Sequence, residues 1–149
     1  MMNNHSTRWG LALALVALLG VACGGDSDEG GAANKADWDK KHAGAVKVVS
    51  DDIDRSVQAL NAGQRPVVLS ECTQLKDDLV DAKKAVPVPD PTVDAALRSA
   101  LTATETAMNT CVEGGRVASD ASIVEKAQRE MKTARDTYDA AQTAIAAWK

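Results

Sequence analysis

The sequence predicts an all-α fold, an up-down four-helix bundle with one inter-helix disulfide. Apolar residues recur at steps of three and four along four separate segments of the chain. Neighbouring segments are separated by short stretches that contain glycine, proline or a capping aspartate. Two cysteines, Cys72 and Cys111, fall on the apolar stripes of the second and third segments. Because the connections are short, consecutive helices should run antiparallel.

The first element is a leader, residues 1–22. Its apolar run from Leu11 to Val21 follows a polar stretch that carries Arg8, and Ala22 and then Cys23 come directly after the run. The run is too short to span a bilayer, which takes about 20 apolar residues in a helix. It is typical of an export signal that is removed. The residues before Cys23 resemble a lipobox, so we expect Cys23 to carry the lipid that anchors the mature chain to the extracytoplasmic side of the cell membrane.

Two alternatives to lipid attachment stay open. Gly20 stands where a lipobox usually has a branched aliphatic residue, and Gly20 and Ala22 also suit an ordinary signal peptidase. The protein would then be secreted without a lipid, or would keep its leader as a membrane anchor. In either case the polar, glycine-rich stretch in residues 23–34 predicts a flexible tether before the folded domain, residues 35–149.

The cysteine count supports the lipid interpretation. The chain has three cysteines, an odd number, and is expected to enter an oxidising compartment. Lipid attachment at Cys23 leaves Cys72 and Cys111 to form a disulfide. A bridge that closes a loop of about 40 residues stabilises a fold by roughly 4 kcal/mol in the chain-entropy model. The alternative is a pair of buried thiols that pack as small apolar side chains.

The first two helices follow from apolar stripes and from the residues that end them. The first stripe comprises Val46, Val49, Ile53, Val57 and Leu60, and the second comprises Val68, Cys72, Leu75, Leu79, Ala82 and Val86. Gly63 supplies a left-handed stop for the first helix. The second opens near Pro66 and ends at the proline-rich segment 87–91. The acidic residues Asp51, Asp52 and Asp54 are interpreted as a solvated face of the first helix.

The third and fourth helices have equally clear starts. Asp90 caps the third, with Pro91 in its first turn, and Gly114-Gly115 is expected to close it. The fourth begins in the segment 119–122. Its stripe carries no charge and comprises Val124, Ala127, Met131, Ala134, Tyr138, Ala141, Ile145 and Trp148.

The up-down topology brings two tryptophans to the end of the bundle where the tether attaches. Trp38, the proline turn and Trp148 should meet there. We expect the two indoles to close the base of a core that contains no Phe. A membrane-proximal or ligand-stacking aromatic cluster of Trp38 and Trp148 is the alternative.

Composition argues against several classes of function. Of 17 basic side chains Arg8 leaves with the leader, so 16 remain against 21 acidic ones, a net charge of −5. This disfavours nucleic acid as a partner. His42 is the single histidine after the leader, which excludes a histidine-rich zinc site. The segment 26–37 has the acidic spacing of a calcium loop only in part. We therefore expect no metal, no cofactor and no enzymatic activity.

Four short motifs resemble a known group of proteins. These are the early Trp38, Cys72-Thr73-Gln74-Leu75, the segment from Val86 to Pro91, and Cys111-Val112-Glu113-Gly114. Together they are similar to uncharacterised small secreted or lipid-anchored helical proteins of actinobacteria. The resemblance implies export, a paired Cys72 and Cys111 and an all-helical domain, and it implies no activity.

The function expected from these features is a protein-interaction module at the cell envelope, with another envelope protein as its partner. The alternative is a small-ligand carrier or sensor whose site lies between the helices.

Overall fold

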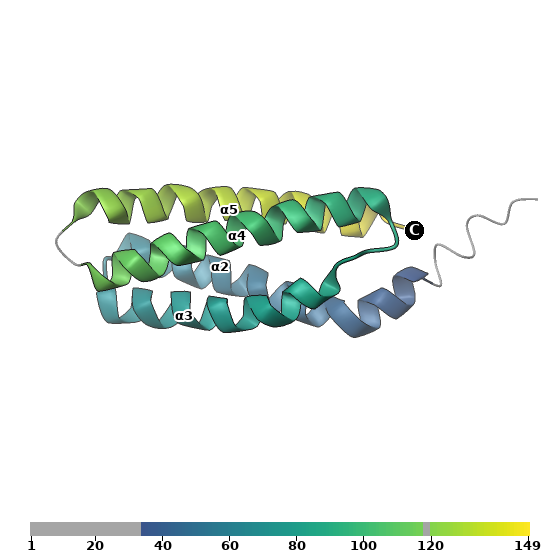
Figure 1. Ribbon diagram of the computed structural model, residues 1–149, viewed down its shortest axis with the longest axis horizontal. Helices are drawn as coiled ribbons and strands as arrows, with labels where there is room; N and C mark the ends of the chain where they lie inside the picture. The colour runs from purple at the N-terminus through teal and green to yellow at the C-terminus, as the bar shows by residue number, and fades with distance from the viewer. Residues whose placement is uncertain (1–33, 118–119) are drawn as a thin grey trace, which may run out of the picture.

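Four long antiparallel helices form an elongated bundle in the computed structural model, which describes residues 34–117 and 120–149 (Figure 1). They are α2 (Gly44–Ala62), α3 (Arg65–Ala82), α4 (Pro91–Arg116) and α5 (Ala121–Ala147). A π-helical turn, η1 (Asp39–Ala43), leads into α2, and a 3₁₀ turn, η2 (Lys83–Ala85), follows α3. The predicted all-α bundle is confirmed. Cys23 and the leader lie outside the described residues, so their roles stay predictions.

The turn between α2 and α3 forms as predicted. Gly63 adopts the left-handed conformation with φ +65°, and its N–H donates to the Leu60 carbonyl at 3.3 Å. A side chain with a Cβ is strained in this region, and glycine is not. Pro66 then occupies the first turn of α3, where a backbone N–H would have no helical partner.

The end of α3 differs from the prediction. The α-helix ends at Ala82 rather than continuing to Val86, and its last turn tightens into η2. Val86 is extended, with φ −107° and ψ 141°. The physical reason is Pro87, whose ring disfavours helical backbone at the residue before it.

Two aspartates fix the connection from η2 to α4. Asp90 caps α4 by accepting hydrogen bonds from the backbone N–H groups of Thr92 at 2.8 Å and Val93 at 2.9 Å. Asp94 reaches back and accepts from the Val88 N–H at 2.8 Å, while Arg98 donates to its other oxygen at 2.7 Å. Asp94 therefore holds the proline-rich connection against the first turn of α4.

Asp94 gives a pH prediction. The hydrogen bond from Arg98 and then the one from Val88 lower the pKa of the Asp94 carboxyl below its usual value. A carboxyl whose pKa is lower in the folded state stabilises the fold above its unfolded pKa of about 3.9, and this contribution disappears as the pH falls through the folded pKa. Asp94→Asn should thus be less stable than wild type at neutral pH. Urea midpoints should converge below about pH 4, and a constant gap would contradict this assignment.

The predicted stop at Gly114-Gly115 is wrong, because α4 continues through both glycines to Arg116. Gly115 serves close helix approach instead. A Cβ built on Gly115 would lie 3.1 Å from the Leu69 backbone nitrogen and 3.2 Å from its Cα. Gly114 is buried against α5, where a Cβ would lie 3.8 Å from the Cβ of Ala127. The absence of a side chain at Gly115 therefore lets α4 pack closely on α3, whereas a Cβ at Gly114 would make only ordinary contacts with α5.

Gly115→Ala tests this close approach. We expect it to lower the free energy of unfolding by about 1–3 kcal/mol, because the added methyl overpacks the contact with the Leu69 backbone. The matched control is Gly44→Ala, since nothing lies within 4 Å of a Cβ at Gly44. Alanine in that helix should instead stabilise by about 0.5–1 kcal/mol. Urea unfolding of the two variants measures both values, and equal shifts would show that Gly115 is not a packing residue.

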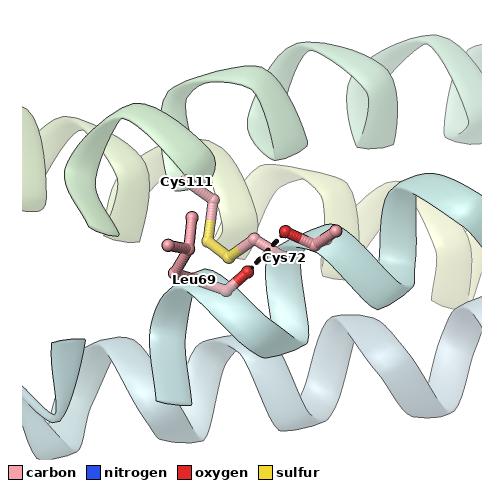
Figure 2. Close-up of a disulfide and its surroundings, with 4 residues drawn as sticks. Leu69, Cys72 and Cys111 are labelled. Carbon is pink, nitrogen blue, oxygen red and sulfur yellow. Dashed lines mark hydrogen bonds between the residues drawn. A yellow bond between two sulfur atoms is a disulfide. The ribbon is translucent and has the colours of Figure 1, made fainter. Parts of the chain in front are cut away.

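The disulfide joins α3 and α4 through the core. Cys72 and Cys111 are both fully buried, and their Cα atoms lie 6.0 Å apart, within the usual range for a bridge. Figure 2 shows the two sulfur atoms between the helices, with Leu69 one turn before Cys72. The predicted pairing of Cys72 with Cys111 is confirmed.

Ion pairs between helices lie outside this core. Arg55 of α2 pairs with Glu71 of α3, with Nε 3.1 Å from the carboxylate oxygen. Arg135 of α5 pairs with Asp54 of α2. These pairs join helices that are antiparallel neighbours and agree with the register set by the turns.

Candidate functional site

The two tryptophans meet at one end of the bundle, as the topology predicts. Their ring centroids lie 5.8 Å apart with the planes tilted by 63°, an edge-to-face arrangement. The indole Nε1–H of Trp38 donates to the Ala85 carbonyl at 2.8 Å. Trp38 is 5% exposed and Trp148 is 8% exposed. We call Trp38, Ala85 and Trp148 the aromatic base, and it closes this end of the core.

The aromatic base lies where the described chain begins. Figure 1 shows the start of the described residues, the α3–α4 connection and the C-terminus at the same end of the bundle. Lys35 Nζ lies 5.8 Å from the centroid of the Trp148 ring and pairs with Asp39 at 2.6 Å. The His42 ring centroid is 6.0 Å from that of Trp38. The base therefore joins the first described turn to the last residues of the chain.

A groove runs beside the aromatic base, between the start of α2 and the end of α5. Its volume is about 390 Å³. Trp38, Val46 and Ile145 contribute apolar surface to it, and Lys35 and Lys47 contribute charged groups. The groove is open to solvent, so a ligand in it would keep one side exposed. No single stretch of the sequence contains a signal for this groove, because its lining comes from residues about 100 positions apart in the chain.

The interpretation of Asp51, Asp52 and Asp54 as one solvated face is wrong for Asp52. Asp51 is exposed and pairs with Lys47 at 2.7 Å, and Asp54 is half-buried. Asp52 is fully buried, where one carboxylate oxygen pairs with Arg55 and the other has no hydrogen-bond partner among the described residues. Asp52 lies three residues after Val49, so the helical period of the core stripe already placed it near the core.

Tyr138 is the largest fully buried side chain of the core. Its hydroxyl has no hydrogen-bond partner within the described part of the chain, and burial raises the pKa of the phenol well above its usual value. The ring fills the space between helices that Phe would fill in other cores.

Tyr138→Phe should raise the free energy of unfolding by about 1 kcal/mol, because it keeps the ring and removes a buried hydroxyl that lacks a partner. Tyr138→Leu is the control that removes ring volume, and it should destabilise by about 2 kcal/mol or more. Thermal or urea unfolding gives both numbers. A loss of stability in Tyr138→Phe would mean that the hydroxyl is hydrogen-bonded to water in the folded protein.

The described residues also give no support to a metal site. Among residues 34–117 and 120–149, no group of three or more His, Cys, Asp and Glu side chains lies close enough to hold a metal ion. Most of the segment 26–37, with its partial calcium-loop spacing, lies outside the described residues.

Within the described part of the chain, every helix is too short or too polar to cross a membrane.

No protein-family model, curated protein or solved structure matches this chain.

Proposed function

We propose that the protein is a lipid-anchored helical bundle that acts as a non-catalytic interaction module at the cell envelope. Cys23 carries the lipid and holds the chain to the extracytoplasmic side of the cell membrane. The bundle binds another envelope protein through the end away from the aromatic base. We call that end, residues 61–71 and 113–117, the distal end.

The observation that carries this proposal is that the chain enters the bundle at one end and leaves the other end free of the tether. The described chain begins at the aromatic base, and the α2–α3 turn lies at the opposite end (Figure 1). A lipid on Cys23 would therefore attach on the side of the base. The distal end would face away from the membrane, where a partner could reach it.

The distal end also offers mixed apolar and charged surface. Val67 is 40% exposed and Val117 is 39% exposed. Val67 lines a shallow groove of about 290 Å³ between α2 and α3, together with Arg55 and Glu71. Val117 lines another, of about 330 Å³, together with Arg116. Apolar side chains beside arginines are common in protein interfaces.

Site-specific photocrosslinking in native membranes tests the proposal. A photoreactive amino acid at Val67 or Val117 should give one discrete adduct with another envelope protein. The matched control is Val80 on α3, which is 59% exposed and lies near the other end of the bundle. An equal adduct pattern at Val80, or no adduct at Val67 and Val117, would contradict a distal binding surface.

A small-ligand carrier is the second candidate, favoured by the groove beside the aromatic base. Native mass spectrometry of protein released from membranes separates the two functions. A non-covalent ligand in stoichiometric amount supports the carrier, and a lipidated chain without additional mass supports the interaction module.

A further inference from the structure

The groove beside the aromatic base has an apolar floor built from both ends of the folded chain. Trp38, Ala43 and Val46 contribute from the first helical segments, and Ile145 and Ala146 contribute from α5. Its volume of about 390 Å³ lies within the range of small-molecule sites in proteins. Trp38 and Val46 belong to the core and are almost fully buried, so the floor is fixed by the packing beneath it.

The charged groups at the rim are already paired with one another. Lys35 pairs with Asp39 at 2.6 Å, and Lys47 pairs with Asp51 at 2.7 Å. A ligand with a carboxylate or phosphate would have to compete with these aspartates for the lysines. The rim therefore favours an uncharged apolar chain over a free fatty acid or a phospholipid headgroup.

The chain itself can bring such a group to the groove. Lys35 lines the groove, and Cys23 lies eleven residues before Asn34, the first described residue. Eleven residues reach at most about 36–40 Å when fully extended. A short tether of this kind gives an attached group an effective concentration in the millimolar range. The attached group would then occupy the groove even if the affinity of the groove for it were low.

We propose that this groove binds one acyl chain of the lipid attached to Cys23. The inference rests on the lipid attachment in the proposed function. It adds the groove, beside the membrane, as a location for one chain of the lipid. Stable membrane anchoring requires more than one acyl chain or a second membrane-binding element. Placing one chain in the groove weakens the hold of the others on the membrane, and the bundle can then leave it or pass to another membrane.

A brominated alkyl probe tests the groove without depending on native lipid attachment. With the Cys72–Cys111 bridge intact, Cys23 is the free thiol of the chain without its leader. It is alkylated with a long-chain brominated alkyl maleimide, and N-ethylmaleimide serves as the reference. Bromine quenches tryptophan fluorescence at short range. Attached probe should quench Trp38 as strongly as free probe at a roughly 100-fold higher concentration.

Two exposed alanines of α5 give a matched pair of variants. Ala146 lines the groove, and Ala140 is exposed but does not line it. Ala146→Phe should bring quenching by the attached probe down to the level of free probe, whereas Ala140→Phe should leave it at the wild-type level. Circular dichroism checks that both variants are folded.

Three results would overturn the inference. They are quenching by attached probe that equals quenching by free probe, quenching that rises with protein concentration, and quenching that Ala146→Phe leaves unchanged. The second would mean that the groove takes a group from another molecule. The proposed function fails separately, if mass spectrometry of protein from native membranes shows an unmodified Cys23.

Discussion

Replacing both Cys72 and Cys111 with alanine should lower the free energy of unfolding by about 4 kcal/mol, one of the two largest effects expected in this protein. The two residues are 39 positions apart, so the bridge closes a loop that contains the end of α3, the proline-rich connection and most of α4. In the chain-entropy model, the bridge acts by restricting the unfolded chain over that loop.

The burial of the two cysteines adds a second contribution to the stability lost in the double alanine variant. Both cysteines are fully buried, so alanine leaves a small cavity where the two sulfur atoms lie in the wild type. Reduction of the wild-type protein separates the two contributions, because it opens the cross-link and keeps the sulfur atoms. The reduced protein should lose most of the roughly 4 kcal/mol, and the alanine variant somewhat more.

Urea unfolding measures both losses. All proteins carry Cys23→Ser, so that no third thiol exchanges with the bridge. The unfolding midpoint should fall in the reduced protein and fall further in the double variant. An unchanged midpoint on reduction would mean that the unfolded chain keeps α3 and α4 together without the bridge.

The parts of the fold that the sequence predicts correctly are those determined by nearby residues. Gly63 ends α2 because its own backbone takes a left-handed conformation, and Asp90 starts α4 through hydrogen bonds to residues two and three positions away. The cysteine pairing was predictable for a related reason. Both residues lie on helical stripes whose spacing can be counted along the chain.

The features that were missed depend on neighbours from other helices. Gly114 and Gly115 look like a helix stop, but Gly115 allows α4 to approach the Leu69 backbone of α3 closely, and Gly114 is buried beside Ala127 of α5. Asp52 is the exception, because it looks like part of a solvated acidic run but is fully buried, and its partner is the exposed Arg55 of the same helix. The groove beside the aromatic base combines residues from both ends of the chain, so neither segment alone contains a signal for it.

The aromatic base leads to the second large prediction. Trp38→Ala should lower the free energy of unfolding by about 3–5 kcal/mol, the usual cost of removing a buried large aromatic side chain. Trp38 packs edge-to-face on Trp148, and its indole N–H is the hydrogen-bond donor to the Ala85 carbonyl. The substitution therefore removes packing, a ring contact and a buried hydrogen bond at once.

Trp38→Phe separates the contribution of the hydrogen bond from that of the ring packing. It keeps most of the ring packing and removes the donor to Ala85, so it should destabilise by about 1–3 kcal/mol, the cost of a buried group left without its partner. Urea unfolding should therefore rank the proteins as wild type, Trp38→Phe and Trp38→Ala, in order of falling midpoint. Equal midpoints for the two variants would assign the whole effect to the hydrogen bond.

A second measurement decides whether the aromatic base belongs to the cooperative fold. Lys40 and Lys41 are exposed and lie within two to three residues of Trp38, in the segment that the indole holds against η2. If the base unfolds together with the bundle, Trp38→Ala should speed trypsin cleavage there in proportion to its loss of global stability. Rapid cleavage with an unchanged urea midpoint would contradict the prediction of about 3–5 kcal/mol, because it would show that the base opens independently of the four helices.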